Sequence, residues 1–346
     1  MGCSLVKYLL SIESTCDETA AAIITRDREV LSSVIASQEQ LHQRFSGVVP
    51  EIAARAHLER ILPVIDETLK RAQITSQDLA AIAVATEPGL PGSLLVGLAT
   101  AKALSWAWNV PLVTVHHVHA HIYACQLMSP EPIFPCVGFV VSGGHTNLYH
   151  CHSASRWDYL GGTIDDAVGE AFDKVAVMLG FPYPGGPAIS KAATQGDPKA
   201  VPLPRPMVDD HSTLNMSFSG LKTAVRYKLV GNGKQDFSKL ELSPQLIADM
   251  AASFEAAAVE CLVAKADLAL KKTRLKRLCV GGGVAANQSL RRDLQAMCKR
   301  RGVELHIASP DLCTDNAVMG AIAWEKVDLG EFAALDADIR PGLLRQ

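Results

Sequence analysis

Residues 6–36 read VKYLLSIESTCDETAAAIITRDREVLSSVIA, and residues 135–163 read PCVGFVVSGGHTNLYHCHSASRWDYLGGT. Each stretch opens on an apolar run, passes through a polar or glycine-containing turn, and returns in further apolar runs, which is typical of strands joined by tight connections. The runs are Val6 to Ile12, Ala20 to Thr25 and Val30 to Ala36 in the first stretch, and Pro135 to Val141, Leu148 to His152 and Tyr159 to Thr163 in the second. The sequence therefore predicts the same β-meander twice.

Helical and strand patterns alternate around the two meanders, which predicts an α/β fold. The expected helices cover Pro50 to Ala72, Pro91 to Trp108, Asp166 to Gly180, Gln245 to Lys272 and Ser289 to Arg301. The further strands cover Ala80 to Thr86, Leu112 to Val115, Arg277 to Val280 and Val303 to Ile307. Residues 200–240 contain three prolines in alternation and are expected to form an irregular insertion. A chain of 346 residues is long enough for two domains.

Composition indicates a globular protein, since 48% of the residues are hydrophobic and 20% are charged. The first residues lack a cleavable leader pattern and no window has the length of apolar sequence that spans a membrane, so we expect a cytoplasmic protein. None of the nine cysteines form a CxxC pair, which favours buried free thiols. Residues 174–346 carry a net charge of +5 (23 Lys+Arg minus 18 Asp+Glu), and basic clusters there could face phosphates or simply form solvated helix ends.

Four short segments could hold anionic groups. The loop from Ser11 to Thr19 and the turn Ser142-Gly143-Gly144 occupy matching places in the two meanders, and glycines let backbone N–H groups approach a phosphate. Gly281-Gly282-Gly283 follows a strand and leads to Asn287 before a helix; Asn287 could bond a ribose or cap that helix. The fourth segment, Tyr183 to Pro187, reads YPGGP and could equally be a plain turn.

The densest chemical signal is residues 116–121, HHVHAH, at a predicted junction of strand and helix. His117 and His121 are four residues apart and would lie on one face of a helix, a spacing that can chelate a metal ion. The glutamate of a zinc-peptidase HExxH helix is absent. Two imidazoles need at least one further ligand, and Asp315 could supply it or could cap a helix. Spacing alone does not select Asp315 among the 36 acids.

Together these residues resemble the TsaD family (also Gcp, YgjD or Kae-type), the tRNA N6-adenosine threonylcarbamoyltransferases once called O-sialoglycoprotein endopeptidases. The resemblance covers nearly the whole chain. The motifs that carry it are ESTCDET (13–19), GVVPE (47–51), PGL (88–90), the run from Lys102 to His121, SGGHT (142–146), IDDAVGEAFDK (164–174), YPGG (183–186), SFSGLKT (217–223), GGGVAAN (281–287) and CTDNA (313–317).

The resemblance implies the acetate kinase, Hsp70 and actin (ASKHA) architecture, with two RNase H-like lobes enclosing a nucleotide cleft. We place the lobes at residues 1–130 and 131–346. It also implies one divalent metal ion, iron or zinc, on His117, His121 and Asp315. The nucleotide-binding residues that it implies are Val140, Val141, Ser142, Gly143, Gly144, Asp173, Gly186 and Asn287. Asp17 and Glu18 match the family's acidic first loop, and either could accept a proton.

The activity implied is transfer of the threonylcarbamoyl group of L-threonylcarbamoyl-AMP to N6 of the adenosine beside the anticodon in tRNAs that read ANN codons. The implied bacterial partners are a degenerate paralogue (TsaB) and a P-loop ATPase (TsaE). This chain departs from the family pattern at Ser11 and Glu87, where glycine is usual. Two other functions remain open: a sugar-kinase-like ATP phosphotransferase, which would not need the histidines, and a metallopeptidase, which lacks its glutamate.

Overall fold

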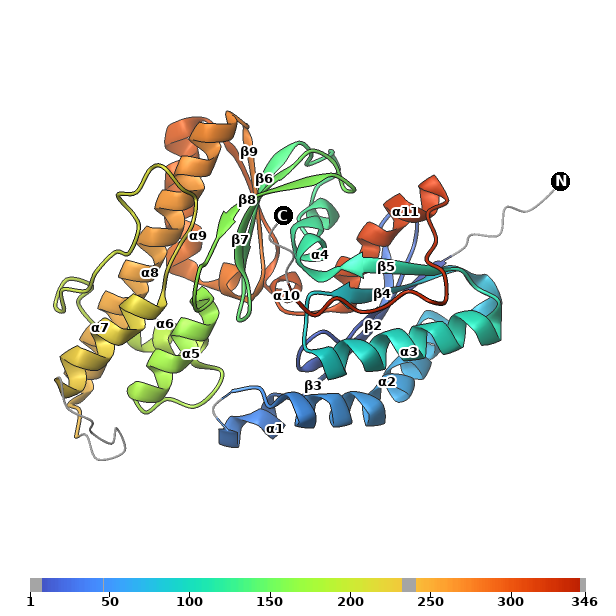
Figure 1. The fold of residues 1–346 in the computed structure, drawn as a ribbon, viewed down its shortest axis with the longest axis horizontal. Coiled ribbons are helices and arrows are strands. Elements are labelled where there is room, and N and C mark those ends of the chain that lie inside the picture. Colours follow the sequence, from blue (N-terminus) through green and yellow to red (C-terminus); the bar gives the residue numbers. More distant parts are fainter. Residues whose placement is uncertain (1–7, 46, 232–240, 343–346) are drawn as a thin grey trace. The chain divides into compact units, whose positions relative to one another are not determined.

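The chain folds into two compact units, each built on its own five-stranded sheet (Figure 1). The computed structural model describes residues 8–45, 47–231 and 241–342. The first unit comprises the described residues of Met1–Glu131 and Asp315–Gln346, and the second comprises those of Pro132–Thr314.

The sheet of the first unit has the order β3-β2-β1-β4-β5. Its strands are β1 (Tyr8–Glu13), β2 (Glu18–Ile24), β3 (Val30–Ser37), β4 (Leu79–Glu87) and β5 (Leu112–His116). β1, β2 and β3 form the antiparallel meander, and β4 and β5 run parallel to β1. The central strands are almost wholly buried, as expected for a sheet that is covered on both faces.

Two long helices, α2 (Pro50–Ala72) and α3 (Pro91–Trp108), pack together and against this sheet. Proline stands in the first turn of each helix, where its missing N–H costs nothing. Figure 1 shows α11 (Ala323–Leu329) across the sheet from α3. The shorter elements of this unit are α1 (Glu39–His42), α4 (His117–Tyr123) and the 3-10 helices η1 (Gln43–Phe45), η2 (Ser76–Asp78), η3 (Gln126–Met128) and η6 (Ala317–Ile322).

The sheet of the second unit has the order β10-β9-β6-β7-β8, which repeats the topology of the first. Its strands are β6 (Cys136–Val141), β7 (Thr146–Cys151), β8 (Trp157–Gly162), β9 (Arg277–Gly281) and β10 (Glu304–Ile307). Its helices are α5 (Val168–Met178), α6 (Gly185–Ala193), α7 (Ser219–Val230), α8 (Pro244–Thr273), α9 (Gln288–Arg301), α10 (Pro310–Cys313) and the 3-10 helix η5 (Gly283–Ala286). The long helix α8 packs on β6 and β7 and is flanked by α6 and α9.

The duplicated meander and the α/β alternation predicted from the sequence are confirmed. α2 and α3 have the predicted bounds, while Val6 and Lys7 of the first predicted strand lie outside the described residues. Two predictions were wrong in part. The insertion at 200–240 is not wholly irregular, because it contains α7, and the segment YPGGP is not a plain turn, because its glycines open α6.

The predicted second lobe ran to residue 346, yet residues 315–342 group with the first unit. The physical reason is backbone pairing with that unit's strands. The N–H of Ala333 donates to the carbonyl of Leu112 at 2.8 Å, and the N–H of Arg340 donates to the carbonyl of Thr86 at 2.9 Å. Short local patterns could not reveal these distant partners.

No helix in the described ranges has both the length and the apolarity needed to cross a bilayer. The eight described cysteines are free thiols and all but Cys16 are buried, in agreement with the packing role predicted from their spacing.

Candidate active site

The paired histidines open α4, directly after β5. The side chain of His116 caps the helix by accepting from the N–H of His119 at 3.4 Å. His117 and His121 then lie one turn apart, as predicted, with ring centroids 4.6 Å from one another. Both are buried, with 4% and 0% of their surface exposed. Neither imidazole is therefore a solvent-exposed surface side chain.

Asp315 comes from the other end of the sequence and faces both imidazoles. Its Oδ1 lies 3.1 Å from Nε2 of His121 and 3.6 Å from Nε2 of His117. The helix-cap role belongs to the next residue, since Asn316 accepts from the N–H of Met319 at 3.2 Å. The alternative reading of Asp315 as a cap is therefore wrong.

Sequence reasoning missed Glu13, which ends β1 and stands behind His117. Its Oε2 lies 3.1 Å from Nδ1 of His117, and its Oε1 accepts from the N–H of Thr15 at 2.7 Å. The hydroxyl of Thr15 lies 3.1 Å from the same Nδ1. A carboxylate on the far nitrogen of a metal-binding histidine is a common arrangement that fixes the tautomer and turns the other nitrogen toward the ion. Glu13 belongs to the ESTCDET motif, but nothing within that motif indicated a contact with His117, 104 residues away.

The group His117, His121 and Asp315 fits a divalent metal ion. One potential ligand atom from each residue lies within 4.8 Å of the others, and Glu13 holds His117 with Nε2 toward Asp315. Two nitrogens and one carboxylate oxygen suit iron or zinc and leave positions open. Burial lowers the pKa of His117, but Glu13 and Asp315 outweigh it and raise the pKa to about 9. A metal ion must therefore displace a proton from this site.

The acidic first loop lies between β1 and β2. Burial is the main cause that raises the pKa of Glu18 from 4.5 to about 7, and the charge of Asp17 adds to it. One oxygen of Glu18 accepts from the hydroxyl of Ser37 at 2.9 Å, while the other, Oε2, is buried without a hydrogen-bond partner among the described residues. A carboxylate with a pKa near neutrality and a spare oxygen can take up a proton.

Helix α2 and the loop before α3 hold this acidic segment in place. His57 places Nε2 3.0 Å from the carbonyl of Cys16 and Nδ1 2.7 Å from the hydroxyl of Thr19. A Cβ at Gly89 would stand 2.7 Å from the carbonyl oxygen of Thr15, so only glycine permits this approach. The family motif PGL therefore has a packing role here.

In the second unit the Ser142-Gly143-Gly144 turn leads from β6 to β7. Val140 and Val141 are fully buried, so the exposed part of this segment begins at the glycines that follow them. The N–H of Ser142 donates to the carbonyl of His145 at 2.7 Å, which closes the turn. Neither Gly143 nor Gly144 has an atom within 4 Å of the position a Cβ would take, so this backbone is open to an approaching group.

Helix α5 joins this turn to the YPGG segment. At its start, the N–H of Gly169 donates to the carbonyl of Ser142 at 3.2 Å. One turn later, Oδ1 of Asp173 accepts from the N–H of Gly185 at 2.7 Å, which anchors the start of α6. No atom lies within 4 Å of where a Cβ would stand at Gly186. Asp173 thus lies beside the YPGG segment that contains Gly186, and the family resemblance had implied both residues.

Asn287 caps α9, because its Oδ1 accepts from the N–H of Leu290 at 2.8 Å. Its amide donates to Oε1 of Glu255 at 2.6 Å and to the hydroxyl of Ser190 at 2.9 Å, which links α9 to α8 and α6. The cap role that the sequence left open is therefore present. Glu255, buried in α8, is a second residue that sequence reasoning missed.

The predicted site residues thus form two groups. The first unit brings together Asp17, Glu18, His117, His121 and Asp315, and the second connects Val140 to Gly144 with Asp173, Gly186 and Asn287. The glycine at 282 belongs to the second group, since its φ is +96° and a Cβ there would lie 2.5 Å from the carbonyl oxygen of Val141.

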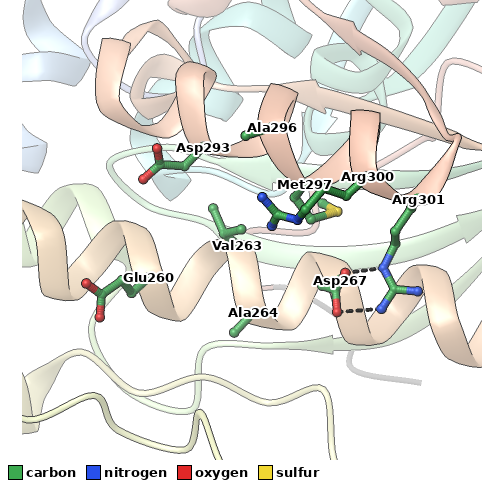
Figure 2. A pocket seen from close by; sticks show the side chains of 9 residues that line it. All are labelled: Glu260, Val263, Ala264, Asp267, Asp293, Ala296, Met297, Arg300 and Arg301. Atoms are coloured by element: carbon green, nitrogen blue, oxygen red, sulfur yellow. Dashed lines mark hydrogen bonds and ion pairs between the residues drawn. The ribbon is translucent and has the colours of Figure 1, made fainter.

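A groove of about 580 Å³ lies elsewhere, between α8 and α9 (Figure 2). Asp267 and Arg301 face one another across it in a double hydrogen bond, of which Nη2 to Oδ2 is 2.6 Å. None of the predicted site residues line this groove. The ion pair also offsets the charge of Arg301, one of three consecutive basic residues with Lys299 and Arg300.

Comparison with known proteins identifies the family. The family described as "TsaD: tRNA N6-adenosine threonylcarbamoyltransferase" matches residues 29–322. The chain belongs to the TsaD family. As a TsaD-family enzyme, it forms threonylcarbamoyladenosine by transferring a threonylcarbamoyl group to tRNA.

Curated members of the TsaD family align over almost the full chain. A tRNA N6-adenosine threonylcarbamoyltransferase from Rhodopirellula baltica is 60% identical over 350 residues, covering 98% of both proteins. The Bacillus subtilis enzyme of the same name is 46% identical and covers 97% of this chain and 95% of its own length.

Solved structures with low identity confirm the fold alone. HypF from T. kodakarensis superposes with a TM-score of 0.60 at 14% identity, covering 94% of this chain and 48% of its own. Component A of the (R)-2-hydroxyglutaryl-CoA dehydratase from Acidaminococcus fermentans gives 0.53 at 14% identity, covering 93% and 99%.

Proposed function

We propose that the chain transfers the threonylcarbamoyl group of L-threonylcarbamoyl-AMP to N6 of the adenosine beside the anticodon in tRNAs that read ANN codons. The observation that carries the assignment of roles is the buried group of His117, His121 and Asp315, supported by Glu13. We place the reacting centre at these residues and at the acidic loop beside them.

The reaction forms a bond between N6 and the carbamoyl carbon and breaks the bond from that carbon to the phosphate oxygen, so AMP leaves. N6 must lose a proton in the same sequence. Glu18 is our choice of acceptor, because its Oε2 has no hydrogen-bond partner among the described residues and burial raises its pKa to about 7. Asp17 keeps the pKa of Glu18 raised by its charge.

His117, His121 and Asp315 would hold a divalent ion, iron or zinc. When bound, that ion supplies a Lewis acid that polarises the carbamoyl oxygen or fixes the threonyl end. Glu13 orients His117 through Nδ1. His121 differs, because its Nδ1 is buried without a hydrogen-bond partner in the described part of the chain.

The AMP part of the donor is assigned to the second group of residues. The open backbone at Gly143 and Gly144 and the start of α6 at Gly186 offer N–H donors and a helix N-terminus to a phosphate, while Asp173 offers a carboxylate that accepts hydrogen bonds. Asn287 caps α9 there, and its amide N–H groups already donate to Glu255 and Ser190, which limits the hydrogen bonds that it can give to a nucleotide.

Transfer RNA must present an unstacked base, since N6 of a stacked adenine cannot reach a catalytic group. Exposed basic residues at the end of α8 would contact its phosphates: Lys271, Lys272, Arg274 and Lys276. As partners we propose a degenerate paralogue (TsaB) and a P-loop ATPase (TsaE), and as location the cytoplasm.

The decisive experiment measures incorporation of radiolabelled threonine from threonylcarbamoyl-AMP into unmodified tRNA, using metal-loaded protein with its partners. Wild type should incorporate label, and the His117→Ala/His121→Ala variant should not. His211→Ala, at an exposed histidine, is the matched control and should behave as wild type. Incorporation by the double variant would remove the paired histidines from the reaction.

The two other functions predict different products. An ATP phosphotransferase would release ADP with a sugar acceptor and would not depend on His117, whereas a metallopeptidase would cleave a glycoprotein in the absence of tRNA. The HVHA sequence of residues 117–120 lacks the glutamate that such a peptidase uses as its base.

A further inference from the structure

A second group of imidazole and carboxylate side chains lies on the β7–β8 hairpin of the second unit. His150 is near the end of β7 and His152 follows the strand, so the two side chains project from the same face. β8 runs antiparallel to β7, and the register places Asp158 opposite His150. These residues stand at the other end of β7 from the Ser142 turn and have no part in the proposed transfer.

The three side chains converge. The rings of His150 and His152 stack with centroids 3.8 Å apart and planes 25° apart, and Nε2 of His152 lies 2.7 Å from Oδ2 of Asp158. One potential ligand atom from each residue lies within 4.8 Å of the others. Within residues 8–45, 47–231 and 241–342, only this group and that of His117 have such an arrangement of three or more ligands.

The hairpin that carries the group is held by other contacts. The N–H of His152 donates to the carbonyl of Arg156 at 2.9 Å, and the indole of Trp157 donates to the carbonyl of Ala154 at 2.8 Å. Trp157 also packs edge to face on Tyr149, with centroids 6.1 Å apart. Since Tyr149 alternates with His150 along β7, these ring contacts occupy the opposite face of the hairpin. The hairpin backbone that carries the ligands is therefore fixed before any ion binds, and only the side chains must turn toward it.

We propose that His150, His152 and Asp158 form a second metal site, which binds a divalent transition-metal ion such as Zn²⁺. Two imidazoles with one carboxylate favour Zn²⁺, Cu²⁺, Ni²⁺ or Co²⁺ over Mg²⁺ and Ca²⁺, which prefer oxygen ligands throughout. His152 and Asp158 keep 29% and 58% of their side-chain surface exposed, so the ion would exchange with solvent and retain water ligands. Its binding would tie the edge strand β8 to β7.

The test uses Zn²⁺ titrated calorimetrically into the metal-free His117→Ala/His121→Ala chain, in which the site described above is removed. We expect one Zn²⁺ to bind, and we expect His150→Gln or Asp158→Asn added to that background to weaken binding about tenfold or more. His211→Gln, at an exposed histidine remote in sequence, is the matched control and should leave binding unchanged.

Two results would overturn the second site: absence of Zn²⁺ binding in the double variant, or binding that His150→Gln and Asp158→Asn both leave intact. Thermal unfolding without metal shows whether each variant is folded, and the exposed Asp158 provides a substitution with little effect on packing. Cobalt absorption in the visible range gives an independent readout of nitrogen ligation. Because the readout is binding and not transfer, failure here would leave the proposed transferase function untouched.

Discussion

Glu13 is the side chain whose role the contacts define most sharply, since its Oε2 lies 3.1 Å from Nδ1 of His117, whereas Nδ1 of His121 has no such partner among the described residues. We predict that Glu13→Gln keeps the fold and lowers metal affinity by about 10- to 100-fold, because the amide no longer stabilises the Nδ1–H tautomer as a charge does. Equilibrium dialysis with Zn²⁺ measures this in a His150→Gln/Asp158→Asn background, which removes the second proposed site.

Glu13→Asp is the control, because it retains the charge and should recover part of the affinity. Should Glu13→Gln bind Zn²⁺ as tightly as wild type, Glu13 would have only a packing role at the end of β1.

The raised pKa of Glu18 predicts how the transfer rate depends on pH. With a pKa of about 7, the Glu18 carboxylate that we propose as the acceptor of the N6 proton is mostly ionised above neutrality and mostly protonated below it. We predict that the transfer rate of wild type falls as the pH drops below 7, and that Glu18→Gln loses about 10²- to 10⁴-fold in rate together with this dependence. Single-turnover transfer measured over the pH range is the assay. A variant that kept the wild-type profile would assign the proton transfer to another group.

The same pKa shift has a consequence for stability with a defined sign. Because the pKa of Glu18 is raised from 4.5 to about 7 on folding, the folded chain binds this proton more tightly than the unfolded chain. The contribution is complete below pH 4.5 and is lost as the pH rises through 7. Wild type should therefore lose stability as the pH rises from about 5 to about 8, whereas Glu18→Gln, which cannot ionise, should not. After allowance for partial exposure, the free energy of unfolding of the variant relative to wild type should increase by on the order of 1 kcal/mol over this range. Urea unfolding at the two pH values measures it.

Strand β1 and helix η6 touch at Ser11 and Gly320, and this contact accommodates one departure from the family pattern. Ser11 stands where glycine is usual, and its side chain fits because Gly320 has none: a Cβ at Gly320 would lie 2.0 Å from Oγ of Ser11. We predict that Gly320→Ala destabilises the fold by about 1–3 kcal/mol through overpacking. η6 begins two residues after Asp315, so the same change should also weaken metal binding.

A double-mutant cycle separates this steric effect from a general loss of helix stability. In the Ser11→Gly background the cost of Gly320→Ala should shrink, because the clashing atoms are gone. Equal costs in both backgrounds, measured by chemical unfolding, would mean that the two positions are independent.

At the scale of the whole molecule, we propose helix α2 as the surface that binds the paralogue. Ile61 and Ile65 face the core and are buried, whereas Leu58 and Leu62 are 65% and 57% exposed. Exposed leucines one helical turn apart are a common anchor for a partner helix.

We predict that Leu58→Asp with Leu62→Asp abolishes capture of the degenerate paralogue. The free energy of unfolding should stay within about 0.5 kcal/mol of wild type, because both positions are exposed. Leu329→Asp, at an equally exposed leucine of α11 with 63% exposure, is the matched control and should still capture the partner. Undiminished capture by the double variant would move the interface away from α2.

Local patterns in the sequence were sufficient for the two meanders, the long helices and the pairing of His117 with His121, because period-2 and period-3.6 repeats and an i,i+4 spacing involve neighbours along the chain. The glycine turns were recognisable for the same reason. Short polar motifs predicted secondary structure less well. The helices α6 and α7 were missed because prolines and glycines there suggested turns.

Contacts between distant parts of the chain required the folded structure. Asp315 lies 194 residues from His121 and Glu13 lies 104 residues from His117, and no local repeat connects such positions. The same holds for residues 315–342, which pair with β4 and β5, and for Glu255, which holds the cap of α9. Which carboxylate meets which histidine depends on how strands and helices pack once the apolar surface is buried, and that packing is a property of the whole unit.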